Sequence, residues 1–246
     1  MFNFFKSKIM SQNNNQSEKV TIYNLIILDE SGSMSCVAQQ TISGCNETIN
    51  NIKSLQEEHA VTQQHFISIY AFQHNPKVHS RYLIKNENPS MVHHITDEDY
   101  QPWGSTNLYD AIGSTLSDIK HHIKNNDKAI GNITIITDGM ENASCEYTHA
   151  HIAKMIEDFK EKGWNFNFIG ANIDVEATAH NLNIDNHLSF AQDEENYKRM
   201  WEAERSSQRA YYKRMERTLK DEDDSVSFAA KMRTISKNYF DATDED

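Results

Sequence analysis

The chain has 246 residues, of which 38% are hydrophobic, and its 36 acidic and 24 basic residues give a formal net charge of -12. This length suits one α/β domain with extensions. The excess of acid argues against nucleic acid as a partner, because a negative surface repels phosphate. The sequence contains no apolar run of the roughly 18 residues that a membrane span requires, so we expect no transmembrane segment.

The amino-terminal and cysteine patterns indicate a cytoplasmic protein. Residues 1–10 lack the apolar core and the small-residue cleavage site of a signal peptide. The three cysteines are odd in number and form no CxxC motif, which is typical of reduced thiols. Residues 11–19 are polar and rich in asparagine, so we predict that 1–19 is an arm followed by a linker.

Strand-like and helix-like patterns alternate after this linker. Residues 20–28 are β-branched and apolar, as in a buried central strand. Residues 36–58 carry apolar side chains at helical spacing, although Gly44 interrupts the pattern. Residues 65–72 predict a second strand. Residues 78–84 follow a short turn, which predicts an antiparallel neighbour for that strand.

The second half of the chain continues this alternation. The predicted elements are a helix from 107 to about 124, a strand at 132–137, a helix at 149–162, a strand at 164–170, a short helix at 174–181, a short strand at 187–190 and a long charged helix at 193–219. Residues 221–246 are acidic, and we predict a disordered tail with a candidate partner-binding helix at 228–235. The order of elements predicts a three-layer α/β/α fold, whose doubly wound, mostly parallel sheet has one antiparallel edge strand.

Two of the apolar strands end in an acid, and hydroxyl residues lie near both acids. Asp29 follows the first strand and is followed by Ser31 and Ser33, whereas Asp138 follows the strand at 132–137. In doubly wound sheets, binding sites form beyond the carboxyl ends of the strands. Thr106 directly precedes a helix at the same predicted edge. Hard oxygen atoms of this kind suit Mg²⁺, Mn²⁺ or Ca²⁺ better than zinc.

The segments DESGSM, GSTNLYDAI and ITDGMEN resemble the von Willebrand factor A (VWA) domain. They match its metal-ion-dependent adhesion site (MIDAS), which is Asp-x-Ser-x-Ser followed by a Thr and an Asp. The resemblance covers roughly 20–217 and implies a VWA domain at 20–192, with 193–220 as its last helix or as an extension. It also implies that the serines and the threonine bind the metal directly and that the aspartates act mostly through water. An acidic side chain of a partner protein would then complete the octahedron.

This resemblance implies a metal-dependent protein-interaction module of the stand-alone, intracellular microbial or phage type. Its expected role is that of an adaptor for a larger complex, such as an AAA+ ATPase. We do not expect an enzyme, because residues 30–34 read ESGSM instead of G-x-S-x-G and no P-loop occurs. Two alternatives remain open. One is a phosphoesterase that uses the same metal ion, and the other is an adhesion protein exported by an unconventional route.

Several polar residues also have plainer interpretations. Residues 29–33 taken alone fit a helix N-cap, since Asp and Ser are good capping residues. We expect Glu30 to be a solvated neighbour of the site, and Asp110 to support the site or the helix that contains it. The histidine pairs at 121–122 and 149–151 are expected on the surface, because neither has a partnering Cys or acid at metal-site spacing.

Overall fold

The computed structural model describes residues 19–123, 126–191, 193–221 and 225–241. Its strands are β1 (Val20–Asp29), β2 (Gln63–His74), β3 (His79–Glu87), β4 (Ala129–Thr137), β5 (Asn165–Gly170) and β6 (Asn186–Ser189). Its α-helices are α1 (Ala38–Glu58), α2 (Leu108–His122), α3 (His149–Lys160), α4 (Val175–Asn181), α5 (Glu194–Lys220) and α6 (Phe228–Ser236), and two short 3-10 helices are η1 (Gly32–Val37) and η2 (Pro89–Met91). In the described residues, no helix has both the length and the apolar character that crossing a membrane requires.

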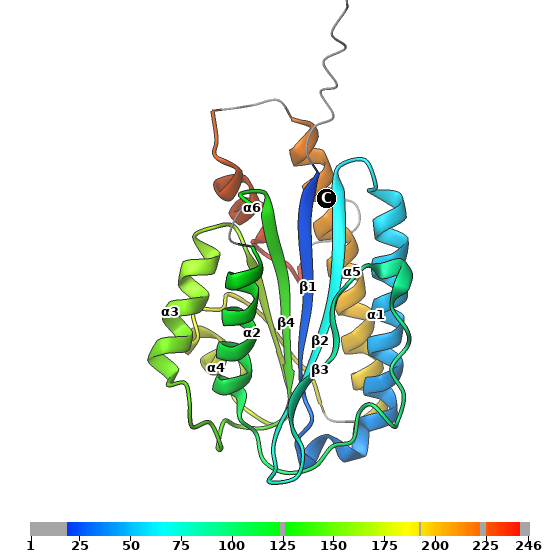
Figure 1. Cartoon of the computed structure of the whole chain (residues 1–246), viewed down its shortest axis with the longest axis vertical. Coiled ribbons are helices and arrows are strands. Elements are labelled where there is room, and N and C mark those ends of the chain that lie inside the picture. The colour runs from blue at the N-terminus through cyan, green and yellow to red at the C-terminus, as the bar shows by residue number, and fades with distance from the viewer. Residues whose placement is uncertain (1–18, 124–125, 192, 222–224, 242–246) are drawn as a thin grey trace, which may run out of the picture.

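The six strands form one sheet in the order β3-β2-β1-β4-β5-β6. All neighbouring strands are parallel except β2 and β3, which are antiparallel. Figure 1 shows α2, α3 and α4 on one side of this sheet and α1 and α5 on the other. The predicted three-layer, doubly wound fold with one antiparallel edge strand is therefore confirmed.

The central strand β1 is apolar on both faces because each face is covered. Tyr23, Leu25 and Ile27 pack with α2, α3 and α4 in one core. Ile26 and Leu28 point to the other face and pack with α1 and the first half of α5. A strand buried on both sides reads as a continuous apolar run, which is the pattern that the sequence shows at 20–28.

Helix α5 packs against the sheet through its aromatic side chains. Tyr197, Trp201, Tyr211 and Tyr212 are all buried. A Cβ atom placed on Gly44 of α1 would lie 2.3 Å from the indole ring of Trp201. The glycine that interrupts the helical pattern of α1 thus provides the space in which α5 inserts this ring.

The carboxy-terminal segment differs from the prediction of a disordered tail. Residues 225–241 are ordered, and Met232 and Tyr239 are buried in a core that they share with α5. The helix predicted at 228–235 is present as α6, and its apolar side chains cover sheet and helix surface although acidic residues flank the segment. Residues 222–224 and 242–246 of the predicted tail, and residues 1–18 of the predicted arm and linker, lie outside the described residues.

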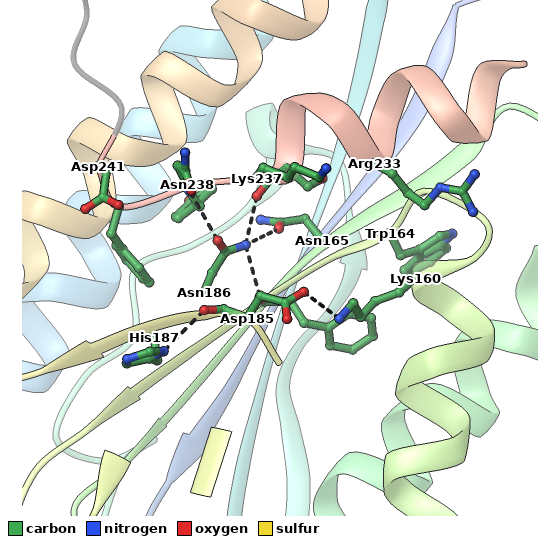
Figure 2. Close-up of a pocket in the computed structure, with 14 residues that line it drawn as sticks. Lys160, Trp164, Asn165, Asp185, Asn186, His187, Arg233, Lys237, Asn238 and Asp241 are labelled. Atoms are coloured by element: carbon green, nitrogen blue, oxygen red, sulfur yellow. Dashed lines mark hydrogen bonds and ion pairs between the residues drawn. The ribbon is translucent and has the colours of Figure 1, made fainter. Parts of the chain in front are cut away.

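Asn186, the first residue of β6, links this segment to the sheet. Its Nδ2 donates to Asn165 Oδ1 at 2.9 Å and to the carbonyl oxygen of Ser236 at 2.9 Å. Its Oδ1 accepts a hydrogen bond from the backbone N–H of Tyr239 at 3.2 Å. Figure 2 shows the side chain of Asn186 at the centre of these contacts, between the sheet and the segment that follows α6.

Candidate metal centre

The loops that follow β1 and β4 leave the sheet at the same edge. Leu28 pairs with Ile136 near the carboxyl ends of these parallel strands, and the strand order reverses at β1. Such a reversal opens a crevice between the helices of the two faces. Asp29 is the last residue of β1, and Asp138 directly follows β4.

The serines after β1 join these two acids. Ser33 Oγ donates to Asp138 Oδ1 at 2.6 Å, and the Ser31 and Ser33 hydroxyl oxygens are 3.2 Å apart. Exposure increases outward through the cluster. Asp29, Ser31 and Asp138 are buried, whereas Ser33 is exposed at the surface. The cluster therefore reaches from the interior of the domain to the solvent.

Thr106 reaches the same cluster from the loop before α2. A Cβ atom built on Gly139 would lie 3.0 Å from Thr106 Oγ1 and 3.9 Å from both Asp29 Oδ2 and Ser33 Oγ. A side-chain position on the loop after β4 is therefore within 4 Å of oxygen atoms from both of the other loops. The structure brings together all of the predicted ligands, which are Asp29, Ser31, Ser33, Thr106 and Asp138.

Backbone hydrogen bonds hold the three loops in place. Gly32 N donates to Gly104 O at 3.1 Å, which ties the first loop to the second. Asn142 N and Ala143 N donate to Thr106 O at 3.0 and 3.1 Å, which ties the second loop to the third. Gly104 has a φ of 78° and lies against the carbonyl group of His74, so a side chain there would be strained and would clash.

Asp29 is a buried carboxylate whose partners are uncharged. Its Oδ2 accepts from Thr137 Oγ1 at 2.6 Å, and its Oδ1 accepts from Ser31 N at 2.7 Å. Burial raises the pKa of Asp29 to about 6, although these hydrogen bonds oppose the shift. Among the described residues, no lysine or arginine forms an ion pair with Asp29. A cation bound beside it would supply the missing counter-charge.

Glu30 differs from its predicted role as a solvated neighbour. Its side chain is fully buried and accepts two hydrogen bonds from the Arg81 guanidinium, at 2.7 and 3.1 Å. It also accepts from Gln73 Nε2 and from Gln101 N, each at 2.7 Å. The prediction is wrong because the antiparallel strand β3 brings Arg81 to this edge, and an ion pair allows the carboxylate to be buried.

Sequence reasoning also assigned no role to Thr137 or Glu141. Thr137 fixes the position of the Asp29 carboxylate, as described above. Glu141 accepts hydrogen bonds from Tyr109 N at 3.0 Å and from Ser144 Oγ at 2.7 Å, which positions the loop after β4 on α2. The interpretation of Asp110 as a support holds, because its carboxylate accepts from the backbone N–H groups of residues 145–147.

The donor set fits a hard divalent cation. The cluster offers hydroxyl and carboxylate oxygens, which Mg²⁺, Mn²⁺ and Ca²⁺ prefer over nitrogen or sulfur. A Cβ atom on Gly139 would lie beside those oxygens, so a side chain there would crowd the cluster. Across the described ranges, no three His, Cys, Asp or Glu side chains are grouped to hold a metal ion, so such a centre depends on the hydroxyl groups of this cluster.

A cavity of about 630 Å³ lies at the opposite end of the sheet, beside the first residues of β5 and β6. Figure 2 shows its lining residues, none of which belongs to the predicted site. Lys160 Nζ donates to Asp185 Oδ2 at 2.7 Å and to Asn183 O at 2.6 Å. The Lys160 ammonium group thus ties α3 to the residues before β6, whereas the Asn186 amide attaches the carboxy-terminal segment.

The sequence matches no protein-family model, and no curated protein matches it. Among solved structures, the chain is similar to the SpRpn10 VWA domain, with a TM-score of 0.51 and 11% identity over 72% of this chain and 92% of that one. It is also similar to the pilus adhesin SpaC from Lactobacillus rhamnosus GG, with a TM-score of 0.55 and 10% identity over 77% of this chain and 30% of that one. The chain therefore has the three-layer fold of VWA domains.

Proposed function

We propose that this chain is a protein-interaction module that binds an acidic side chain of a partner through a divalent cation in a MIDAS. The observation that carries the proposal is the meeting of hydroxyl and carboxylate oxygens from three loops at one edge of the sheet. Ser31, Ser33 and Thr106 would bind the ion directly, and Asp29 and Asp138 would bind it through water. Mg²⁺ is the proposed ion, and Mn²⁺ or Ca²⁺ could occupy the same site.

The chemistry of the ligands explains why a partner acid would be needed. Hydroxyl ligands are neutral, so a bound divalent cation keeps much of its charge and can accept a carboxylate from outside. The chain's own residues orient the site, because Thr137 holds the Asp29 carboxylate and Ser33 lies at the surface where a partner can approach. An acid would be repelled by the cluster without a cation, since Asp29 and Asp138 are negatively charged when ionised.

We further propose that the module is a stand-alone cytoplasmic adaptor for a larger complex, such as an AAA+ ATPase, and that the interacting domain extends over 20–192 together with 193–220. Support for these bounds comes from α5, whose buried face packs along the sheet. Support for a reducing compartment comes from the cysteines, which form no disulfide in the described part of the chain.

Affinity capture with the immobilised full chain tests the proposal. We expect partner recovery in Mg²⁺, loss of recovery in EDTA and loss of recovery with Thr106→Ala, which removes one proposed ligand. Recovery that is unaffected by both treatments would overturn the proposal. Turnover of p-nitrophenyl phosphate that disappears in Asp138→Ala would favour a phosphoesterase instead, and secretion of the chain from its own cells would favour an adhesion protein.

A further inference from the structure

We propose that the partner segment carries bulky apolar side chains on both sides of its acidic residue, and that Trp103 and Met140 bind those side chains. This inference rests on the proposed function of the same site and adds the chemistry of the partner. It commits to a linear peptide segment with the pattern apolar-x-acid-x-apolar.

Two exposed apolar side chains lie on the loops of the metal centre. The exposed large hydrophobic side chains of the described residues are Val61, Val78, Met91, Trp103, Met140 and Val226. Trp103 is 69% exposed and Met140 is 73% exposed. A single exposed apolar residue needs no explanation, but two such residues at one candidate site suggest a contact surface.

Both residues are close to the oxygen cluster. Consecutive Cα atoms are about 3.8 Å apart. The Cα atom of Trp103 therefore lies within about 11 Å of the Thr106 Cα atom, and the Cα atom of Met140 lies within about 8 Å of the Asp138 Cα atom. Trp103 N donates to Glu30 O at 2.8 Å, which ties Trp103 to the loop that contains the serines. Met140 belongs to the loop after β4. The backbone of each residue is therefore close to a residue of the cluster, and each side chain is exposed on a loop that contributes oxygens or is bonded to one that does.

Hydrogen bonds hold the backbone next to these side chains in place before any partner binds. Trp103 is anchored to Glu30, whose carboxylate is buried in the ion pair with Arg81. Met140 follows Gly139, whose N–H donates to Thr137 Oγ1 at 3.2 Å and whose carbonyl oxygen accepts from the same hydroxyl at 3.1 Å. Because the loop backbone is already ordered, binding costs little backbone entropy at these positions.

The type of occupant follows from charge and from side-chain chemistry. A divalent cation in the cluster attracts a carboxylate, and this charge complementarity places the acidic residue at the centre of the contact. Trp and Met are enriched in interfaces, where Trp often dominates the binding energy and Met adapts its shape. In an extended peptide, alternate residues lie on one face about 7 Å apart, so the neighbours at i-2 and i+2 point to the same surface as the acid.

A displayed peptide library tests the inference. Peptides with a fixed central Asp and random flanks are selected on the full chain in Mg²⁺ and eluted with EDTA. We expect enrichment of aromatic and aliphatic residues two positions from the acid. We expect the selected peptides, measured by fluorescence polarisation, to bind Trp103→Ala and Met140→Ala at least about 10-fold more weakly, which is about 1.4 kcal/mol for each substitution.

Met91→Ala is the matched control, because Met91 is 69% exposed but lies far from the metal centre. Its neighbour Val92 accepts a hydrogen bond from Lys53 in the second half of α1, whereas Ser31 and Ser33 lie before the start of that helix. Binding by this variant should equal that of the unchanged chain. Mg²⁺ uptake, measured by calorimetry, should be the same for all three variants.

The outcomes separate the inference from the function on which it rests. Selected peptides without apolar flanks, or unchanged binding by Trp103→Ala and Met140→Ala, would overturn the inference alone. Recovery of no peptide in Mg²⁺ would also overturn it, because the occupant would not be a linear segment. Peptide binding that survives both EDTA and Thr106→Ala would instead overturn the proposed metal-dependent function.

Discussion

Ser33 Oγ donates a hydrogen bond of 2.6 Å to Asp138 Oδ1, although the two residues are 105 positions apart in the sequence. This bond connects the loop after β1 with the loop after β4. Because the two strands are neighbours in the sheet, their loops are held at a fixed separation. The fold itself therefore holds the proposed ligands close together, which limits the reorganisation that ion binding would require.

Gly139→Ala should weaken metal binding without unfolding the chain. The added methyl group would lie 3.0 Å from Thr106 Oγ1, in the space that the cluster oxygens border. We expect Mg²⁺ affinity measured by calorimetry to fall at least about 10-fold, as for other changes beside metal ligands. Gly32→Ala is the control, because its Cβ would make only ordinary contacts of 3.6 and 3.9 Å with Gly104. Equal Mg²⁺ affinity for the two variants would contradict an ion site beside Gly139 and Thr106.

Arg81→Ala should destabilise the fold because it leaves the Glu30 carboxylate buried without its cation. We expect a loss of about 3 kcal/mol in the free energy of unfolding, measured by urea denaturation. The double variant with Glu30→Gln should recover part of this loss, since the buried charge is then removed. Lys85→Ala breaks the exposed pair with Asp118 and should cost less than about 1 kcal/mol. A similar cost for Arg81→Ala and Lys85→Ala would mean that the Glu30 pair is not effectively buried.

Gly44→Ala should destabilise the packing of α5 on α1. The new Cβ would lie 2.3 Å from the Trp201 ring, so either the ring or the helix has to move. We expect a loss of about 1–3 kcal/mol in the free energy of unfolding. Ser43→Ala, at the exposed neighbouring position of α1, should leave stability within about 0.5 kcal/mol. Gly44→Ala should cost much less in a Trp201→Leu background, and an equal cost there would assign the effect to something other than this contact.

Glu204 on α5 should make the stability of the fold depend on pH. It is buried against β4 with Oε1 accepting from Thr134 Oγ1 at 2.9 Å, and in the described residues its Oε2 has no hydrogen-bond partner. Burial raises the pKa of Glu204 to about 8 from the ordinary value of 4.5. The folded chain therefore binds more protons than the unfolded chain between about pH 4.5 and about pH 8.

By linkage, the contribution of Glu204 to stability is greatest below about pH 4.5 and decreases as pH rises to about 8, by up to about 1.4 kcal/mol per pH unit. Glu204→Gln should remove this dependence, so the variant should gain stability relative to the unchanged chain as pH rises. Urea denaturation at several pH values between these limits measures the difference. Glu202→Gln, at an exposed position of the same helix, should follow the unchanged chain. Parallel curves for Glu204→Gln and the unchanged chain would show that Glu204 is not held protonated.

The sheet and the oxygen cluster were predictable because both depend on local patterns. Buried parallel strands produce continuous apolar runs, such as 20–28, that end where the chain leaves the core. The residues that follow such runs meet at one edge of the sheet, so Asp29 and Asp138 could be placed together without knowing any contact.

The roles of Glu30 and of α6 were not predictable in the same way. The partner of Glu30 is Arg81, and only the pairing of β3 with β2 brings that residue to the site. The motif Asp-x-Ser-x-Ser also gives no information about its intervening residues. For α6, the sequence predicted a helix at 228–235 but placed it in a disordered acidic tail, whereas burial of Met232 and Tyr239 depends on the surface that α5, β1 and β4 provide.

Calorimetric titration of the full chain with Mg²⁺, repeated with Mn²⁺, tests the metal centre most directly. Thr106→Ala removes a proposed ligand, and Thr62→Ala, next to the amino-terminal end of β2, is a matched control at the other end of the sheet. We predict one ion bound by the unchanged chain and by Thr62→Ala, and binding at least about 10-fold weaker in Thr106→Ala. Absence of binding in the unchanged chain, or equal binding by Thr106→Ala, would contradict a metal centre in this cluster.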